Sequence, residues 1–201
     1  MTPFFERIIA LFLIILIFPF FIVLYLLVKL TSKGPFLFTQ TRVGLDKKLF
    51  TLYKICTMVN NAEKLKKKYL HLNEVDGPVF KIRNDPRYTK FGKFLSHTGL
   101  DELPQLINIL KGEMSFVGPR PLPPDEAAKL SVKYQRRFSI LPGITSPWVV
   151  RGSHKLNFRE WMDSDLGYID HSKTFLNNLV ISLNTVRIII KLMLKSLLNV
   201  L

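Results

Sequence analysis

The sequence predicts an α+β fold that is mainly helical and associated with a membrane. Three observations support this prediction. A charge-free apolar run fills residues 8–28, apolar residues with regularly spaced cations fill residues 173–201, and the polar region between them holds one β-hairpin pattern among several helical ones. A chain of 201 residues is long enough for one domain with a hydrophobic core. We therefore expect one structural domain with three parts, residues 1–33, 34–172 and 173–201.

The chain is strongly basic, with 29 Lys and Arg residues against 15 Asp and Glu residues and a formal net charge of +14. This charge implies a polyanionic partner, which is nucleic acid, anionic lipid or a phosphorylated substrate. A nucleic-acid binder would interleave aromatic and basic side chains on a recognisable module. The Phe-rich segments here are contiguous apolar runs. We therefore expect no nucleic-acid partner, and favour anionic membrane lipids and a phosphorylated substrate.

The first apolar run extends from Ile8 to Val28. A straight helix of this length reaches about 30 Å, enough to cross a hydrocarbon core. The run is too long for a cleavable signal peptide, and no small-residue cleavage pattern follows it. Pro19 lies near its midpoint, where proline kinks or breaks a helix. Arg7 and Lys29 flank the run, and basic flanks favour the cytoplasmic side. Two alternatives remain: a spanning anchor, and a re-entrant helix that enters and leaves through one leaflet.

The C-terminal segment combines apolar residues with three evenly spaced cations. Arg187, Lys191 and Lys195 follow one another at intervals of four, which places them along one face of a helix. Such a helix is typical of the membrane interface, where its cations lie near lipid phosphates. The alternative is a helix that packs in a core or a coiled coil. We favour an interfacial amphipathic helix on an anionic membrane surface.

The polar middle predicts several short elements. A β-hairpin is expected around VGLDKK within residues 34–58. NNAEKLKKKYLHL predicts a basic, solvated helix that begins at Asn caps. The Asp-Pro pair in DGPVFKIRNDPRYTKFGKFL is expected to open another helix. A further helix is expected over Asp125–Phe138, and LPGITSPWVVRGS predicts a loop or a short strand.

Residues 99–112, GLDELPQLINILKG, place two acids side by side in this basic chain. We predict a helix over Leu103–Lys111 that ends at Gly112. Asp101 and Glu102 would then lie at its N-terminus, where acids cap free amides and complement the helix dipole. The buried stripe of this helix is predicted to be Leu103, Leu106, Ile107 and Leu110.

A chemical role for the two acids is the alternative. MSFVGPRP follows the helix and places Arg120 between two prolines, which reduces the entropy lost when its guanidinium is held. A preorganised Arg near a carboxylate suits a bidentate grip on phosphate. An ionised carboxylate at a helix start can attack phosphorus or hold Mg²⁺. These patterns leave capping and phosphoryl transfer as alternatives for Asp101 and Glu102.

The block GLDELPQLINILKGEMSFVGPRP closely resembles the signature of the bacterial sugar transferase family, the monotopic phosphoglycosyl transferases or polyprenyl-phosphate hexose-1-phosphate transferases. GPFLFTQTRVG, YKICTM, VFKIRNDPRYTKFGKFL and LPGIT are similar to further family blocks in the same order. The resemblance implies transfer of a sugar-1-phosphate from a nucleoside diphosphate sugar, which we expect to be a UDP-sugar, to polyprenyl phosphate. This reaction is the first membrane step of a glycan or exopolysaccharide pathway.

The resemblance also implies the roles of individual residues. Asp101 attacks the sugar-bearing phosphorus and forms a covalent aspartyl-phosphate sugar, which the lipid phosphate then displaces. Glu102 positions or assists, and the expected cofactor, Mg²⁺, binds beside Asp101. Phosphate- or substrate-binding roles fall on Lys54, Arg87, Pro119 and Arg120.

The family further implies how the chain lies at the inner (cytoplasmic) membrane. Residues 1–33 are expected to form a re-entrant helix broken at Pro19, residues 34–172 a catalytic region that faces the cytoplasm, and residues 173–201 a helix flat on the membrane. Some family positions are replaced. Ser96 stands where Arg is usual, and Ser146 and Val149 replace a Gly and a Gln. These replacements leave a non-catalytic membrane-bound relative of the family as the alternative function.

Overall fold

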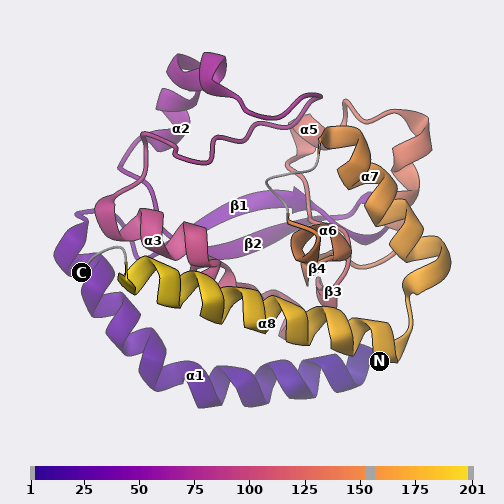
Figure 1. The fold of residues 1–201 in the computed structure, drawn as a ribbon, viewed down its shortest axis with the longest axis horizontal. Coiled ribbons are helices and arrows are strands. Elements are labelled where there is room, and N and C mark those ends of the chain that lie inside the picture. The colour runs from indigo at the N-terminus through magenta and orange to yellow at the C-terminus, as the bar shows by residue number, and fades with distance from the viewer. Residues whose placement is uncertain (1–2, 153–156, 199–201) are drawn as a thin grey trace.

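The computed structural model describes residues 3–152 and 157–198. Two long helices, α1 and α8, run along one edge of the molecule, and shorter elements lie above them around a two-stranded sheet (Figure 1). The η elements are 3₁₀ helices, except η5, which is a π-helix. In chain order the elements are α1 (Pro3–Thr31), β1 (Leu37–Val43), η1 (Leu45–Lys47), β2 (Leu49–Ile55), α2 (Ala62–Leu65), η2 (Lys66–Leu72), α3 (Lys90–Thr98), η3 (Leu100–Gln105), α4 (Leu106–Lys111), β3 (Ser115–Val117), α5 (Pro124–Ala127), η4 (Val132–Ser139), β4 (Gly143–Thr145), α6 (Pro147–Val150), α7 (Phe158–Gly167), η5 (Tyr168–Ser172) and α8 (Phe175–Leu198).

Helix α1 is bent, but it is not broken. It continues without interruption through Pro19, and Figure 1 shows its two halves meeting at an angle. Proline removes one hydrogen bond and crowds the preceding turn, which bends a helix that its other hydrogen bonds still hold together. The prediction of a proline-broken helix is therefore wrong in this detail. Both halves pack against the rest of the protein, the first through Ala10 and the second through Leu24 and Val28.

Both long helices expose apolar side chains. Helix α1 is the one helix in the described part of the chain that is long and apolar enough to cross a membrane, and 11% of its most apolar window is buried. On α8 the inward face carries the buried Ile181, while the outward face carries an apolar stripe. The stripe residues are Leu176, Leu179, Val180, Leu183, Val186, Ile190 and Leu194. Exposed apolar area on this scale is typical of a surface that meets a membrane or another protein.

The predicted hairpin is confirmed. Strands β1 and β2 pair antiparallel from Leu37 opposite Ile55 to Val43 opposite Leu49. The short strand that was one alternative for LPGITSPWVVRGS is β4, while Pro147–Val150 of that segment form the helix α6, which was not predicted. Strand β4 pairs parallel with β3, and each of these strands is only three residues long. Parallel pairing brings together segments that are distant in sequence, and no local pattern records it. The close approach at this pair requires glycine, because a Cβ on Gly143 would lie 2.1 Å from the backbone nitrogen of Gly118.

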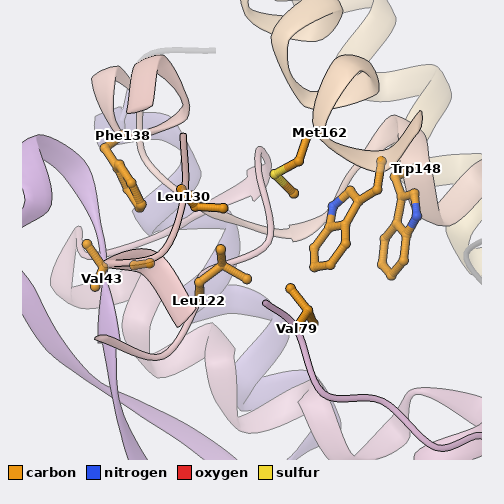
Figure 2. Close-up of a cluster of buried hydrophobic side chains, with 9 residues drawn as sticks. Val43, Val79, Leu122, Leu130, Phe138, Trp148 and Met162 are labelled. Atoms are coloured by element: carbon orange, nitrogen blue, oxygen red, sulfur yellow. The ribbon is translucent and has the colours of Figure 1, made fainter. Parts of the chain in front are cut away.

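One hydrophobic cluster joins β1, the loop before α5, and helices α5, η4, α6 and α7. Figure 2 shows side chains of this cluster, among them Val43, Leu122 and Phe138, filling the space between these elements. Trp148 and Trp161 stack at its edge, with ring centroids 4.4 Å apart. This cluster lies behind the loop that carries Arg120, so it forms the rigid base of that loop.

Two predicted helices are divided in the structure, and a third begins later than predicted: α3 starts at Lys90, capped by Thr89, and not at the Asp85–Pro86 pair. The helix expected over Asp125–Phe138 is divided into α5 and η4, because the backbone becomes extended at Ser131 (φ −61°, ψ 155°). This break lets Leu130 and Phe138 enter the same core cluster. The helix expected from NNAEKLKKKYLHL is divided into α2 and η2, and Asn61, at its N-cap, makes no capping hydrogen bond. The C-terminal region 173–201 is a helix to Leu198, and residues 199–201 lie outside the described residues.

Candidate active site

The two adjacent acids lie in a tight turn between α3 and α4. Gly99 ends α3 with a positive φ of 77°, and the 3₁₀ helix η3 begins at the next residue. Asp101 and Glu102 therefore lie inside η3, one turn before the α-helix, rather than at the start of an α-helix at Leu103. The predicted stop at Gly112 is confirmed, with φ 78°.

The buried face of this helix differs in part from the predicted stripe. Leu106 is buried as predicted, while the other three predicted positions are half-buried. Ile109 and Asn108 are buried in their place. The reason is that η3 advances the chain by a different angle per residue than an α-helix, which rotates the face that α4 presents to the core.

Asp101 and Glu102 are held by two cations. The Nζ atom of Lys54 lies 3.0 Å from Oδ2 of Asp101 and 3.4 Å from Oε1 of Glu102. Nη1 of Arg120 donates to the same Oε1 of Glu102 at 2.8 Å. Asp101 is only 3% exposed, and among the described residues Lys54 is its one ion-pair partner. The acids therefore form a cluster of two carboxylates and two cations in which Asp101 is buried and the other three side chains are partly exposed, and their contacts do not cap α4.

This cluster separates the protonation behaviour of the two carboxyl groups. Burial raises the pKa of Asp101, and the attraction of Lys54 only partly opposes it. Burial acts in the same sense on Glu102, but the charges of Arg120 and Lys54 and their hydrogen bonds outweigh it and lower the pKa of Glu102 to about 2. A pair of acids with pKa values driven apart is typical of sites where each acid has its own chemical role.

Lys54 is placed by β2 and by a polar residue on α4. Asn108 is fully buried, and its side chain accepts from the backbone N–H of Tyr53 at 3.2 Å and donates to the carbonyl of Thr51 at 2.7 Å. It also donates to Glu113 at 2.7 Å. These bonds fix β2 against α4 and so hold Lys54 beside the acids. Sequence reasoning missed Asn108, although a polar residue on an apolar helix face was a visible signal.

Arg120 lies on a loop whose backbone is held from β4. The N–H of Gly118 donates to the carbonyl of Thr145 at 3.0 Å, and the N–H of Gly143 donates to the carbonyl of Pro119 at 3.0 Å. The prolines on either side of Arg120 restrict the backbone further. The carbonyl of Pro119 thus accepts a hydrogen bond from the protein itself. The binding of a substrate by Pro119 stays a prediction.

Arg87, to which the sequence assigned phosphate binding, is committed to other protein groups. It is 6% exposed, and its Nε and Nη2 atoms donate to the two carboxylate oxygens of Asp85 at 2.9 and 2.6 Å. Its Nη1 donates to the carbonyl of Ala62 at 3.0 Å. These bonds tie α2 to the segment before α3. A phosphate would have to displace them, so the contacts favour a structural role for Arg87.

Two further cations lie near Arg120, and sequence reasoning did not single them out. Burial and the charge of Arg120 lower the pKa of Arg42 to about 10 and that of Lys81 to about 8. Arg42 donates to the carbonyl of Pro121 at 3.1 Å, and the Nζ atom of Lys81 lies 4.9 Å from the ring centre of Trp148. The surroundings of Arg120 therefore carry an excess of positive charge that suits a phosphorylated ligand.

Comparison with known proteins identifies the family of this chain. The family model for bacterial sugar transferases matches residues 1–192. The chain belongs to this family. The galactosyl transferase CpsE of Streptococcus agalactiae is 44% identical over 138 residues, which are 68% of this chain and 31% of that protein. The undecaprenyl-phosphate galactose phosphotransferase of Salmonella typhimurium is 35% identical over 175 residues, 85% of this chain and 37% of that protein.

A third relative carries a different sugar in its name. The undecaprenyl-phosphate glucose phosphotransferase of Komagataeibacter xylinus is 36% identical over 141 residues, 67% of this chain and 25% of that protein. The chain thus spans between a quarter and two fifths of the length of these three relatives. Because the names of the relatives include both galactose and glucose, the family alone does not specify the sugar.

Ser96, at the position where the resemblance led us to expect Arg, belongs to a neutral pair. The hydroxyl groups of Ser96 and Tyr88 lie 2.9 Å apart. Burial raises the pKa of Tyr88, so its hydroxyl keeps its proton at neutral pH. This pair therefore brings no positive charge to the site.

Asp101 and Glu102 are also the groups that could hold the Mg²⁺ that the sequence predicts. Mg²⁺ is usually bound by one or two carboxylates together with substrate phosphates and water. Two adjacent carboxylates fit this requirement. Within residues 3–152 and 157–198, no group of three or more His, Cys, Asp or Glu side chains is arranged to bind a metal. A metal at this site would share its coordination with a substrate phosphate, and its binding stays a prediction.

Proposed function

We propose that the protein is a phosphoglycosyl transferase that moves a sugar-1-phosphate from a nucleoside diphosphate sugar, which we expect to be a UDP-sugar, to polyprenyl phosphate. The observation that carries this proposal is the partly buried cluster in which Lys54 contacts both Asp101 and Glu102 and Arg120 contacts Glu102. Family membership and the names of two relatives, which are undecaprenyl-phosphate sugar phosphotransferases, support it.

The reaction proceeds in two displacements at one phosphorus atom. First, a carboxylate oxygen of Asp101 attacks the sugar-bearing phosphorus, an O–P bond forms, and the P–O bond to the nucleoside monophosphate breaks. The bonding electrons leave with the nucleoside monophosphate. Second, an oxygen of polyprenyl phosphate attacks the same phosphorus, and the bond to Asp101 breaks. The products are a polyprenyl diphosphate sugar and a free carboxylate.

The other members of the cluster have electrostatic roles. Glu102, with a pKa of about 2, is ionised at neutral pH and acts as a positioning residue rather than as an acid. It holds Arg120 and Lys54 where the phosphate charge develops. Because Lys54 bridges both acids, it can turn from Asp101 to an incoming phosphate and so free the attacking oxygen. Mg²⁺ bound beside Asp101 would supply further screening of phosphate charge.

The two long helices support a location of this site at the membrane surface. One substrate lies in the bilayer and the other is a soluble anion, so the site must lie at the head-group plane. We propose that α1 enters and leaves the cytoplasmic leaflet of the inner membrane, with its bend at Pro19 inside, and that α8 lies flat on the same leaflet. The exposed Arg187, Lys191 and Lys195 of α8 would then contact anionic lipid phosphates.

A donor-panel assay tests this function. The purified chain in lipid nanodiscs, with polyprenyl phosphate and Mg²⁺, is given a panel of nucleotide sugars, and nucleoside monophosphate release is measured. We expect release with at least one donor and none from Asp101→Asn. With the acceptor omitted, mass spectrometry should find a sugar phosphate on the Asp101 peptide. If no donor gives release above the Asp101→Asn control, the chain is a non-catalytic relative of the family.

A further inference from the structure

A buried ion pair lies directly behind the loop that carries Arg120. Arg137, on η4, and Asp165, on α7, are 3% and 1% exposed. Nη2 of Arg137 donates to Oδ2 of Asp165 at 2.8 Å, and the same Nη2 donates to the backbone carbonyl of Arg120 at 2.8 Å. The pair therefore contacts the main chain of the residue whose side chain holds Glu102.

The surroundings of this pair are apolar. The guanidinium of Arg137 lies 5.7 Å from the ring centre of Trp161 and 5.9 Å from that of Phe138, and both rings belong to the core cluster of Figure 2. Removing two charges from water carries a desolvation cost that their attraction often fails to recover, so apolar residues would stabilise such a place equally well. A contribution to stability is therefore a weak explanation for a charged pair at this place. The hydrogen bond from the pair to the Arg120 backbone is a stronger one.

The hydrogen bonds of the loop show what this geometry achieves. Two hydrogen bonds join the loop to β4. The N–H of Gly118 donates to β4, and the carbonyl of Pro119 accepts from it. The carbonyl of Arg120 is the next backbone acceptor along the loop, and Arg137 donates to it from η4. The loop is thus fixed by β4 before Arg120 and by the Arg137–Asp165 pair at Arg120 itself. Asp165 in turn fixes the orientation of the Arg137 guanidinium.

We propose that Arg137 and Asp165 are positioning residues for Arg120. Asp165 orients Arg137, Arg137 fixes the backbone of Arg120, and Arg120 is thereby aimed at Glu102 and at the phosphate of the substrate. This inference rests on the proposed function for its effect on rate. Its structural part, the fixing of the loop, holds independently of that function.

The test is a double-mutant cycle between Asp165→Asn and Arg120→Ala. Residues that act through a shared partner give non-additive effects. We expect Asp165→Asn to lower the rate of nucleoside monophosphate release about tenfold in the wild-type background, and less than about twofold when Arg120→Ala is already present. The chain offers a matched control, the exposed ion pair between Arg136, which precedes Arg137 on η4, and Asp170, which lies on η5 directly after α7. Asp170→Asn should leave the rate unchanged.

Two further measurements keep the proposal falsifiable. Arg137→Lys keeps the charge but lacks the planar guanidinium whose Nη2 donates to both partners, so it should show the same non-additivity. Hydrogen exchange of residues 115–122, followed by mass spectrometry, should become faster in Asp165→Asn and stay unchanged in Asp170→Asn. This second readout needs no turnover, so it tests the positioning role even if no donor is ever found.

The outcomes separate the possibilities. A similar loss of rate from Asp165→Asn in both backgrounds would show a general structural role and overturn the proposal, as would unchanged exchange in the loop. If Asp165→Asn does not fold, as judged by thermal melting, Arg137→Lys decides the question by the same two measurements. A third outcome combines two results: the wild-type chain releases no nucleoside monophosphate, and hydrogen exchange of residues 115–122 is faster in Asp165→Asn. It would refute the proposed function and leave the positioning role supported.

Discussion

Replacing Arg120 by Met should make the activity depend on the ionisation of Glu102. In the wild-type protein the pKa of Glu102 falls from 4.5 to about 2, although burial acts in the opposite direction. This lowering corresponds to about 3 kcal/mol in favour of the carboxylate. Arg120 is the largest of the groups that produce it, ahead of Lys54. Removing Arg120 should therefore remove about half of this preference, which lowers the ratio of ionised to neutral Glu102 about tenfold.

The sign of the pH effect follows from this shift. A lowered pKa stabilises the folded wild-type protein above pH 4.5, and this contribution is lost as the pH falls toward 2. In Arg120→Met the pKa of Glu102 rises, because only Lys54 is left to oppose burial. The variant should then lose activity at a higher pH than the wild-type protein, in addition to any loss that the titration of Asp101 causes in both proteins.

The assay is nucleoside monophosphate release between about pH 4.5 and 8 for the wild-type protein, Arg120→Met and Arg120→Lys. Arg120→Lys keeps the positive charge, so its profile should stay close to that of the wild type, although its rate falls because Lys lacks the bidentate fork. If the profile of Arg120→Met runs parallel to that of the wild type, Glu102 does not depend on Arg120 for its charge, and the reasoning from the cluster is refuted.

Two further predictions concern the fold and the membrane. Gly92→Ala should destabilise the protein by about 1–3 kcal/mol or more, because its Cβ would lie 1.9 Å from the carbonyl of Thr57. Gly167→Ala, where nothing lies within 4 Å, should not lower the melting temperature, and equal losses in both would contradict the packing argument. The double substitution Leu183→Glu and Ile190→Glu should weaken the contact of α8 with the bilayer, which is measured as less quenching of a fluorophore on α8 by brominated lipids. Both side chains are more than half exposed, so the melting temperature of the protein in detergent should stay unchanged. Undiminished quenching would show that α8 does not lie on the bilayer.

Local sequence patterns were sufficient for elements that depend on near neighbours. The hairpin follows from a β-rich run around a turn, and the end of α4 at Gly112 follows from the freedom of glycine to adopt a positive φ. The pairing of Asp101 with Glu102 and the placement of Arg120 between prolines were also visible. These features indicated the candidate site before any contact was known.

Contacts across long sequence separations were not visible in this way. Whether Asp101 caps a helix or pairs with a cation depends on β2, which brings Lys54 to it from 47 positions earlier in the chain. The burial of Arg137 with Asp165 depends on the packing of η4 against α7. No periodic pattern encodes such pairs, because a charged residue in a sequence looks the same whether it faces water or a buried partner.

The sequence by itself determined that the chain has two apolar ends, a basic polar middle, a hairpin and a pair of adjacent acids, because hydrophobic and turn-forming residues act over a few positions. The tertiary structure decided which cations those acids meet, which of the two carboxyl groups keeps its charge most firmly, and what holds Arg120 in place. The physical reason is that burial and electrostatic attraction act between groups that only the folded chain brings within a few ångströms of each other.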